Sequence, residues 1–117
     1  MNNLNAAFTA LADPTRRAIL ARLAKGEATV NELVEPFAIS QPAVSQHLKV
    51  LEAAGLIVRR VEGTKRPCSL NQEGMQAVEA WMSQQRATWE NRLDRMESYV
   101  NQLKQKEQKD AKRKRDT

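Results

Sequence analysis

A helix predicted over residues 40–55, with the sequence SQPAVSQHLKVLEAAG, constrains the fold of this chain more than any other segment. Ser40 suits an N-cap, Pro42 is tolerated in the first turn, and Gly55 is typical of a helix stop. Helical spacing places three apolar residues on one face, namely Val44, Leu48 and Leu51. That face needs a core to cover it, and the opposite face is free to meet a partner.

The opposite face is mostly polar and consists of Ser40, Gln41, Pro42, Ser45, Gln46 and Lys49. Glutamine can bind adenine through two hydrogen bonds, serine contacts several bases, and lysine neutralises phosphate. A polar face that meets only water has the same composition, so the neighbouring segments are needed to distinguish the two. His47 lies at the flank of the buried face, where a packed or hydrogen-bonded imidazole fits the pattern as well as a DNA contact.

The segment before this helix predicts a second, shorter helix over residues 29–37, TVNELVEPF. Thr29 and Glu32 have the spacing of a capping box, and Pro36 ends or distorts the last turn. Two residues then separate this helix from Ser40. A short helix, a tight turn and a capped helix with a polar face form a helix-turn-helix, which favours DNA binding.

Two earlier helices complete the predicted helical part. The first has Leu4, Phe8 and Leu11 on its apolar face and ends near Asp13 and Pro14, and the second runs from Pro14, with Asp13 as its cap, to about Lys25. Its inward residues are Ile19, Leu20 and Leu23, and its arginines, Arg16, Arg17 and Arg22, are expected mostly in water.

Strand-forming residues follow the 40–55 helix as a β-hairpin that ends at Leu70 and turns at the segment EGTK. Its tip carries Lys65 and Arg66. A basic hairpin beside such a helix is a wing, which can reach the DNA backbone or an adjacent minor groove while the helix enters the major groove. Arg59 and Arg60 alternate faces, so one of the two is expected to reach DNA, and we assign Arg60.

A long helix is predicted from residue 71 or 72 to about Leu103, with an apolar stripe in steps of three, four and seven residues. The stripe consists of Met75, Val78, Met82, Trp89, Leu93, Met96, Val100 and Leu103, and Trp81 widens it. A domain of this size cannot cover such a strip, so we expect it to pack against a second copy of the chain. Dimer contacts are predicted at Leu4, Phe8, Met82, Trp89, Leu93, Met96 and Val100. Docking of a different protein on the same helix is the alternative.

The chain has 117 residues and a net charge of +5, which indicates one domain over residues 1–103 followed by a basic tail over residues 104–117. The tail has seven basic and three acidic residues and no apolar face, so we expect it to be disordered. Within residues 1–103, positive charge is concentrated between residues 49 and 66, as expected of a surface that binds nucleic acid. The expected fold is mainly α-helical with a small β-hairpin.

Cys68 is the only cysteine, which excludes a disulfide within the chain. A buried thiol is the simplest interpretation of it, and a thiol-responsive regulator is the alternative. The sequence shows neither a signal peptide nor an apolar run long enough to span a membrane, so we expect a cytoplasmic protein without membrane contact. It lacks a nucleophile with a neighbouring base, a paired carboxylate motif and a phosphate-binding glycine loop, so we expect neither an enzyme nor a cofactor.

The chain resembles the ArsR family of bacterial winged helix-turn-helix repressors over roughly residues 3–100. The resemblance rests on the segments DPTRRAILARL and ISQPAVSQHLKVLEAAGLIVRRVEGTKRPCSL. It implies a homodimer joined through the first and last helices, which binds partly palindromic double-stranded operators and represses its own operon. It also implies that Gln41, Ser45 and Gln46 meet base edges, with His47 beside them and Lys49 near the backbone.

The resemblance raises the question of metal sensing. Metal-sensing members carry paired cysteines in the third helix, where this chain has Thr29 and Asn31, or a carboxylate and histidine set in the last helix, where it has no histidine. A zinc site needs several ligands in which histidine or cysteine is prominent, and one Cys68 with one distant His47 cannot supply it within a protomer. We therefore expect no metal site, a place in the metal-independent branch, and an inducer that the sequence does not identify.

Overall fold

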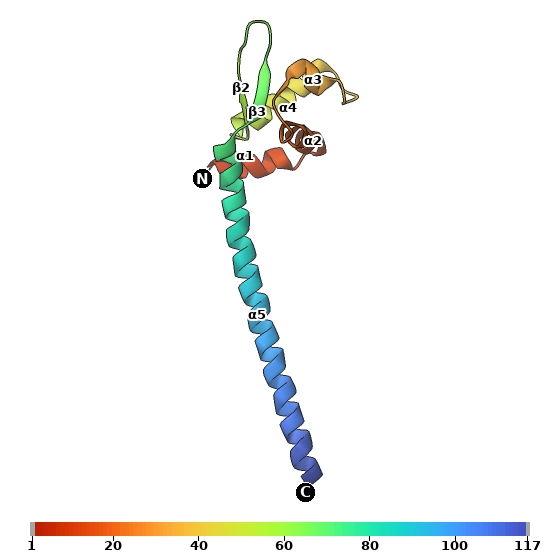
Figure 1. Cartoon of the computed structure of the whole chain (residues 1–117), viewed down its shortest axis with the longest axis vertical. Coiled ribbons are helices and arrows are strands. Elements are labelled where there is room, and N and C mark those ends of the chain that lie inside the picture. Colours follow the sequence, from red (N-terminus) through yellow and green to blue (C-terminus); the bar gives the residue numbers. More distant parts are fainter. Residues whose placement is uncertain (1, 117) are drawn as a thin grey trace. The chain divides into compact units, whose positions relative to one another are not determined.

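The computed structural model describes residues 2–116, and the side chains of residues 4–113 within them. The elements in chain order (Figure 1) are α1 (Asn2–Leu11), α2 (Pro14–Leu23), β1 (Ala28–Thr29), α3 (Val30–Val34), α4 (Gln41–Ala53), β2 (Ile57–Arg59), β3 (Pro67–Leu70) and α5 (Gln72–Asp116). The chain forms two compact units: unit 1 is Met1–Ala80 and unit 2 is Trp81–Thr117.

The fold class expected from the sequence is confirmed, because unit 1 packs short helices around a small antiparallel sheet. The sheet has three strands in the order β1-β3-β2, so β3 is central. Strand β1 is missing from the sequence prediction. It has two residues, Ala28 and Thr29, which pair with Cys68 and Pro67 of β3, and a segment this short shows no alternation by which to recognise it.

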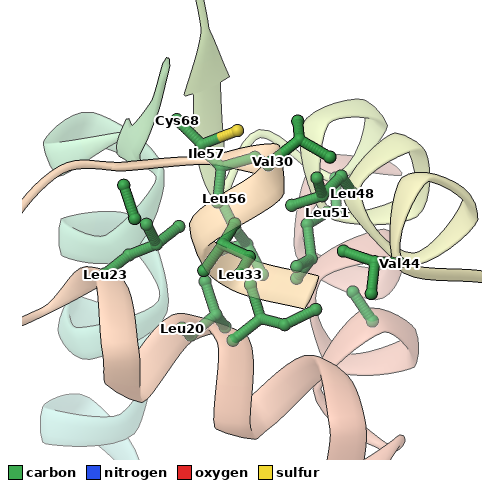
Figure 2. Close-up of a cluster of buried hydrophobic side chains, with 14 of the residues drawn as sticks. Leu20, Leu23, Val30, Leu33, Val44, Leu48, Leu51, Leu56, Ile57 and Cys68 are labelled. Carbon is green, nitrogen blue, oxygen red and sulfur yellow. The ribbon is translucent and has the colours of Figure 1, made fainter. Parts of the chain in front are cut away.

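The core of unit 1 is built from the predicted inward faces of its helices. Figure 2 shows these side chains from the helices and strands converging on one cluster. Its fully buried large members are Ile19, Leu33, Val44, Leu48, Leu51, Leu56 and Cys68. The face of α4 predicted to be apolar is therefore covered, and its opposite face is left outward.

The three helix caps expected from the sequence are confirmed. The backbone N–H of Ala43 donates to Ser40 Oγ at 3.3 Å, and that of Arg16 donates to Asp13 Oδ2 at 3.0 Å. Thr29 and Glu32 form the full capping box of α3. The hydrogen bond from the backbone N–H of Thr29 lowers the pKa of Glu32. The stability that this hydrogen bond contributes to the fold is therefore present above the ordinary carboxyl pKa, and it is lost as the pH falls through the lowered value.

Substitution of Ser40 by alanine should lower the free energy of unfolding by about 1 kcal/mol, because the N–H of Ala43 loses its acceptor at the start of α4. Urea denaturation followed by circular dichroism measures the change. Ser83→Ala is the matched control, because Ser83 lies inside α5 and is exposed. An equal loss in both variants would show that the cap contributes nothing.

The first turn of α5 touches the end of α4 through two glycines. Gly55 ends α4 with φ +77°, a conformation that glycine adopts freely. A Cβ atom added to Gly74 would lie 1.8 Å from the carbonyl oxygen of Gly55 and 2.8 Å from its carbonyl carbon. The backbone N–H of Asn71 donates to the carbonyl of Leu56 at 2.9 Å beside this contact. Position 74 therefore admits no side chain without movement of the backbone.

Helix α5 does not end near Leu103, as the sequence predicts, but continues to Asp116. Residues 104–116 are mostly lysine, glutamine, glutamate and arginine, which are good helix formers, and no glycine or proline interrupts them. Side chains of unit 2 are exposed throughout residues 81–113. Within the described part of the chain, no helix combines the length and the apolar character that a membrane span needs.

Candidate nucleic-acid interface

A concave polar surface lies between α3, the first turns of α4 and the hairpin, with a volume of about 390 Å³. Its lining residues are Thr29, Val30, Asn31, Glu32, Gln41, Ser45, Arg59, Thr64, Lys65 and Arg66. We call it the concave surface. It brings together four residues that the sequence predicts to contact DNA: Gln41, Ser45, Lys65 and Arg66. The lining combines two amides, three hydroxyls and three cationic groups, which suits hydrogen bonding to base edges and neutralisation of phosphate.

The other predicted contact residues of α4 lie outward beside the concave surface. Ser40, Pro42, Gln46 and Lys49 are exposed. They take this position because Val44, Leu48 and Leu51 hold the opposite face of α4 in the core. Ser40 also has a structural role, because its hydroxyl oxygen accepts the hydrogen bond that starts the helix.

His47 is half-buried and turns toward α2. Its Nδ1 lies 3.4 Å from Nη1 of Arg16 and 3.9 Å from Oδ2 of Asp13. The Arg16 backbone N–H lowers the pKa of Asp13, and the His47 charge acts in the same direction. The sequence leaves two roles open for His47, a packed or hydrogen-bonded imidazole and a DNA contact. These distances describe a hydrogen-bonded imidazole.

The arginines of α2 have a use that the sequence analysis missed. Arg16 donates from Nε to the carbonyl of Ala10 at 2.7 Å, and Arg17 donates from Nη1 to the carbonyl of Leu11 at 2.8 Å. These carbonyls belong to the last turn of α1, whose acceptors have no partner within the helix. The sequence signal for this role is the position of Arg16 and Arg17, which lie two and three residues after Pro14 and directly after a short helix.

The hairpin tip is a tight turn between Glu62 and Lys65. The N–H of each of these residues donates to the carbonyl of the other, at 3.0 and 2.9 Å. Gly63 takes φ +63° inside the turn. Arg66 Nη1 donates to the carbonyls of Gly63 and Lys65, both at 2.9 Å. These hydrogen bonds connect the tip to its own backbone, and the Lys65 side chain is exposed on it.

Arg60, the strand arginine assigned from the sequence, does not line the concave surface. Its Nη1 and Nη2 donate to the two carboxylate oxygens of Glu27 at 2.6 and 3.1 Å, and Nη2 lies 3.6 Å from Oε2 of Glu62. The hydrogen bonds to Glu27 raise the pKa of Arg60 above its ordinary value. Arg59, which was not assigned, lines the concave surface beside Gln41 and Ser45.

The predicted dimer residues fall in both units. Leu4 and Phe8 of α1 are half-buried in unit 1. The stripe residues of unit 2 are exposed large hydrophobic side chains: Met82, Trp89, Leu93, Met96, Val100 and Leu103. Trp89 and Met96 are 59% and 62% exposed, and Tyr99 adds a further aromatic ring at 61%. Exposed apolar side chains in a row mark an interaction surface.

Cys68 is fully buried in β3, and its burial raises the pKa of the thiol. Its Sγ lies 3.8 Å from the carbonyl oxygen of Arg66. A buried thiol with a raised pKa forms little of the reactive thiolate. Among the described residues, no group of three or more histidine, cysteine, aspartate or glutamate side chains is placed to hold a metal ion.

Comparison with known proteins places the chain among regulators. A model of the family described as "Bacterial regulatory protein, arsR family" matches residues 13–58. The HTH-type transcriptional regulator Rv2034 of Mycobacterium tuberculosis is 51% identical over 72 residues, which cover 62% of this chain and 67% of that protein. The transcriptional repressor SdpR of Bacillus subtilis is 40% identical over 82 residues, or 70% of this chain and 88% of the repressor.

A solved structure supports the same assignment. The crystal structure of an ArsR family transcriptional regulator superimposes with a TM-score of 0.70 and 46% sequence identity, and the match covers 76% of this chain and 92% of the other. The fold, the sequence identity and the extent of coverage agree. The chain belongs to the ArsR family of bacterial regulatory proteins.

Proposed function

We propose that the chain is a sequence-specific DNA-binding repressor that acts in the cytoplasm, without catalytic activity, on double-stranded DNA. The observation that carries the proposal is the concave surface, where Gln41 and Ser45 of α4 face the same space as Lys65 of the wing. A relative named as a transcriptional repressor supports repression as the outcome of binding. A partly palindromic operator upstream of its own gene is the expected target.

The proposed contacts divide by chemistry. Gln41, Ser45 and Gln46 read base edges in the major groove, because amides and hydroxyls match the donors and acceptors exposed there. Lys49, Lys65 and Arg66 neutralise backbone phosphates, and Ser40 and Pro42 lie at the backbone where α4 begins. His47 is proposed to act mainly through Arg16 and Asp13, and its distances to them support this role.

The protein acts as a homodimer in this proposal. The exposed stripe of unit 2 supplies apolar side chains at steps of seven residues, Met82, Trp89, Met96 and Leu103, with Leu93 and Val100 between them. Such spacing favours a seam between two helices. Leu4 and Phe8 of α1 add to the interface. Two copies of α4 related by a two-fold axis would then read half-sites about 34 Å apart.

Release from DNA does not need a metal in this proposal. The chain has one cysteine and one histidine, and the cysteine is buried in the core. A zinc site with ordinary ligands would therefore have to be built mostly from carboxylates. Zinc added to the purified protein should leave its operator affinity unchanged, and a fall in affinity would contradict this part of the proposal.

The basic tail is proposed to exchange between helix and coil over residues 104–116. Its side chains through residue 113 are exposed, and a helix without a packed apolar face is marginal in water. Its positive charge then adds attraction to DNA that does not depend on sequence. Hydrogen exchange tests this, because slow exchange of the tail amides in the free protein would contradict it.

A gel shift with the DNA upstream of the protein's own gene tests the proposed function. Specific binding should be at least about 1,000-fold tighter than binding to a random duplex of equal length at the same salt concentration. Footprinting of the protected region then gives the operator and its symmetry. Equal affinity for both duplexes would refute a sequence-specific repressor.

Alanine at Gln41 or Gln46 should relax base preference at particular operator positions, by about 1–3 kcal/mol for each lost bidentate contact. Alanine at Lys65 should instead weaken all sequences alike and reduce the slope of log affinity against log salt by about 0.9. Binding to a library of operator variants separates the two effects. Gln76→Ala, an exposed glutamine of α5, is the control. A uniform loss of affinity for all sequences in the Gln41, Gln46 and Lys65 variants would contradict the assignment of base-reading residues.

Docking of another protein on unit 2 is the second candidate function, because the same exposed stripe could be covered by a different helix. Sedimentation of the purified chain separates the candidates. A dimer supports the proposed repressor, and a stable monomer favours docking.

A further inference from the structure

The register of the sheet separates the two neighbouring arginines of the wing. Ala28, Cys68 and Arg59 lie directly opposite one another across the three strands. Side chains of directly opposed residues lie on the same face of a sheet. Ala28 and Cys68 are buried, so this is the face that packs on the helices. Arg59 extends from the same face into the concave surface.

Arg60 follows Arg59 and projects from the opposite face, because side chains alternate along a strand. Its backbone N–H donates to the carbonyl of Pro67 at 2.9 Å, where the ladder between the two sides of the hairpin ends. The side chain joins Glu27, which immediately precedes β1, to Glu62, which begins the wing turn. One guanidinium thus holds the base of the wing between two carboxylates.

These partners make Arg60 a poor phosphate ligand as it stands. Two carboxylates beside one guanidinium leave a net negative charge, and both nitrogens of the guanidinium fork already donate to Glu27. Arg59 has no such pair of carboxylates in the concave surface, where Glu32 is the one acidic lining residue and is bound by Thr29. Of the two arginines, the one whose guanidinium Glu27 and Glu62 do not hold is therefore Arg59, on the side of α4.

We propose that Arg59 is the strand arginine that contacts DNA, and that Arg60 is a positioning residue whose ion pairs with Glu27 and Glu62 set the angle of the wing. The inference rests on the proposed function and refines it. The ion pairs are about half-exposed, and exposed pairs contribute little to stability. Their loss should therefore change the orientation of the wing and leave the fold intact.

Operator affinity measured across a salt series distinguishes the roles, with the variants R59Q, R60Q, E27Q and E27Q/R60Q. R59Q should weaken binding about 10-fold and reduce the slope of log affinity against log salt by about 0.9, the effect of one lost phosphate contact. R60Q and E27Q should each weaken binding several-fold with no change in slope. The double variant should be no weaker than either single one, because both remove the same contact.

Two controls account for charge alone. Glu35→Gln removes an exposed carboxylate, and Lys25→Gln removes an exposed cation, both outside the concave surface. If Arg60 itself contacts DNA, E27Q frees it and binding tightens beyond the effect of Glu35→Gln. That result overturns the inference, as does an equal fall in slope for R60Q and R59Q.

A readout without DNA separates this inference from the proposed function. The amides of Glu62 and Lys65 are hydrogen-bonded within the wing turn. Their hydrogen exchange should accelerate in R60Q and E27Q and stay unchanged in R59Q. Unchanged exchange in all three variants overturns the positioning role. Wild-type protein that binds the operator no better than random DNA refutes the proposed function instead.

Discussion

Replacement of Gly74 by alanine should lower the free energy of unfolding by about 3 kcal/mol or more, which corresponds to a fall in melting temperature on the order of 10–20 °C. The added methyl group would lie 1.8 Å from the carbonyl oxygen of Gly55. The obstacle is backbone at the end of α4, so no rotamer change relieves it. Thermal unfolding followed by circular dichroism measures the loss.

Gly63→Ala is the matched control for this substitution. Gly63 has φ +63°, and a Cβ atom there meets nothing within 4 Å. Alanine at Gly63 therefore adds backbone strain without a clash, at a cost of about 1–2 kcal/mol. A Gly74→Ala protein that melts like the wild type would show that α5 does not approach Gly55 as closely as the structure describes.

The sequence predicted the helices of unit 1 well, because each carries its own local signals. Ser40, Asp13 and Thr29 are caps that act within a single turn, and the buried faces follow from helical spacing alone. The contact at Gly74 was not predicted, because its reason lies in a segment some twenty residues earlier, at Gly55. Local sequence patterns predict helices and strands, whereas contacts between segments that are distant in the sequence can be identified only in the folded chain.

The same limit applies to the candidate interface. Gln41, Ser45 and Lys65 could be proposed together, because a helix-turn-helix followed by a hairpin has a known arrangement. Alternation along the strand showed that Arg59 and Arg60 face opposite ways, but it could not say which one faces α4. That answer came from the pairing of Arg59 with Cys68, which is buried in the core.

The double substitution Trp89→Glu and Met96→Glu should convert the proposed dimer into a monomer and weaken operator binding by about 100- to 10,000-fold. Both side chains are more than half exposed in the single chain, at 59% and 62%. Two added carboxylates per chain would have to be buried in an apolar seam, which is costly without partners. A monomer also loses the gain that comes from linking two DNA-binding modules.

Asn91→Glu with Ser98→Glu is the matched control, because it adds the same charge to exposed positions of α5 off the apolar stripe. This control should remain dimeric and keep its operator affinity, apart from a small loss through added negative charge. Sedimentation and gel shifts with a full operator and a single half-site complete the test. Since only the linkage is lost, the Trp89→Glu, Met96→Glu protein should bind the half-site nearly as well as the wild type does. Dimers in both variants would place the interface elsewhere, whereas a monomer that keeps full operator affinity would mean that one α4 and one wing suffice for recognition.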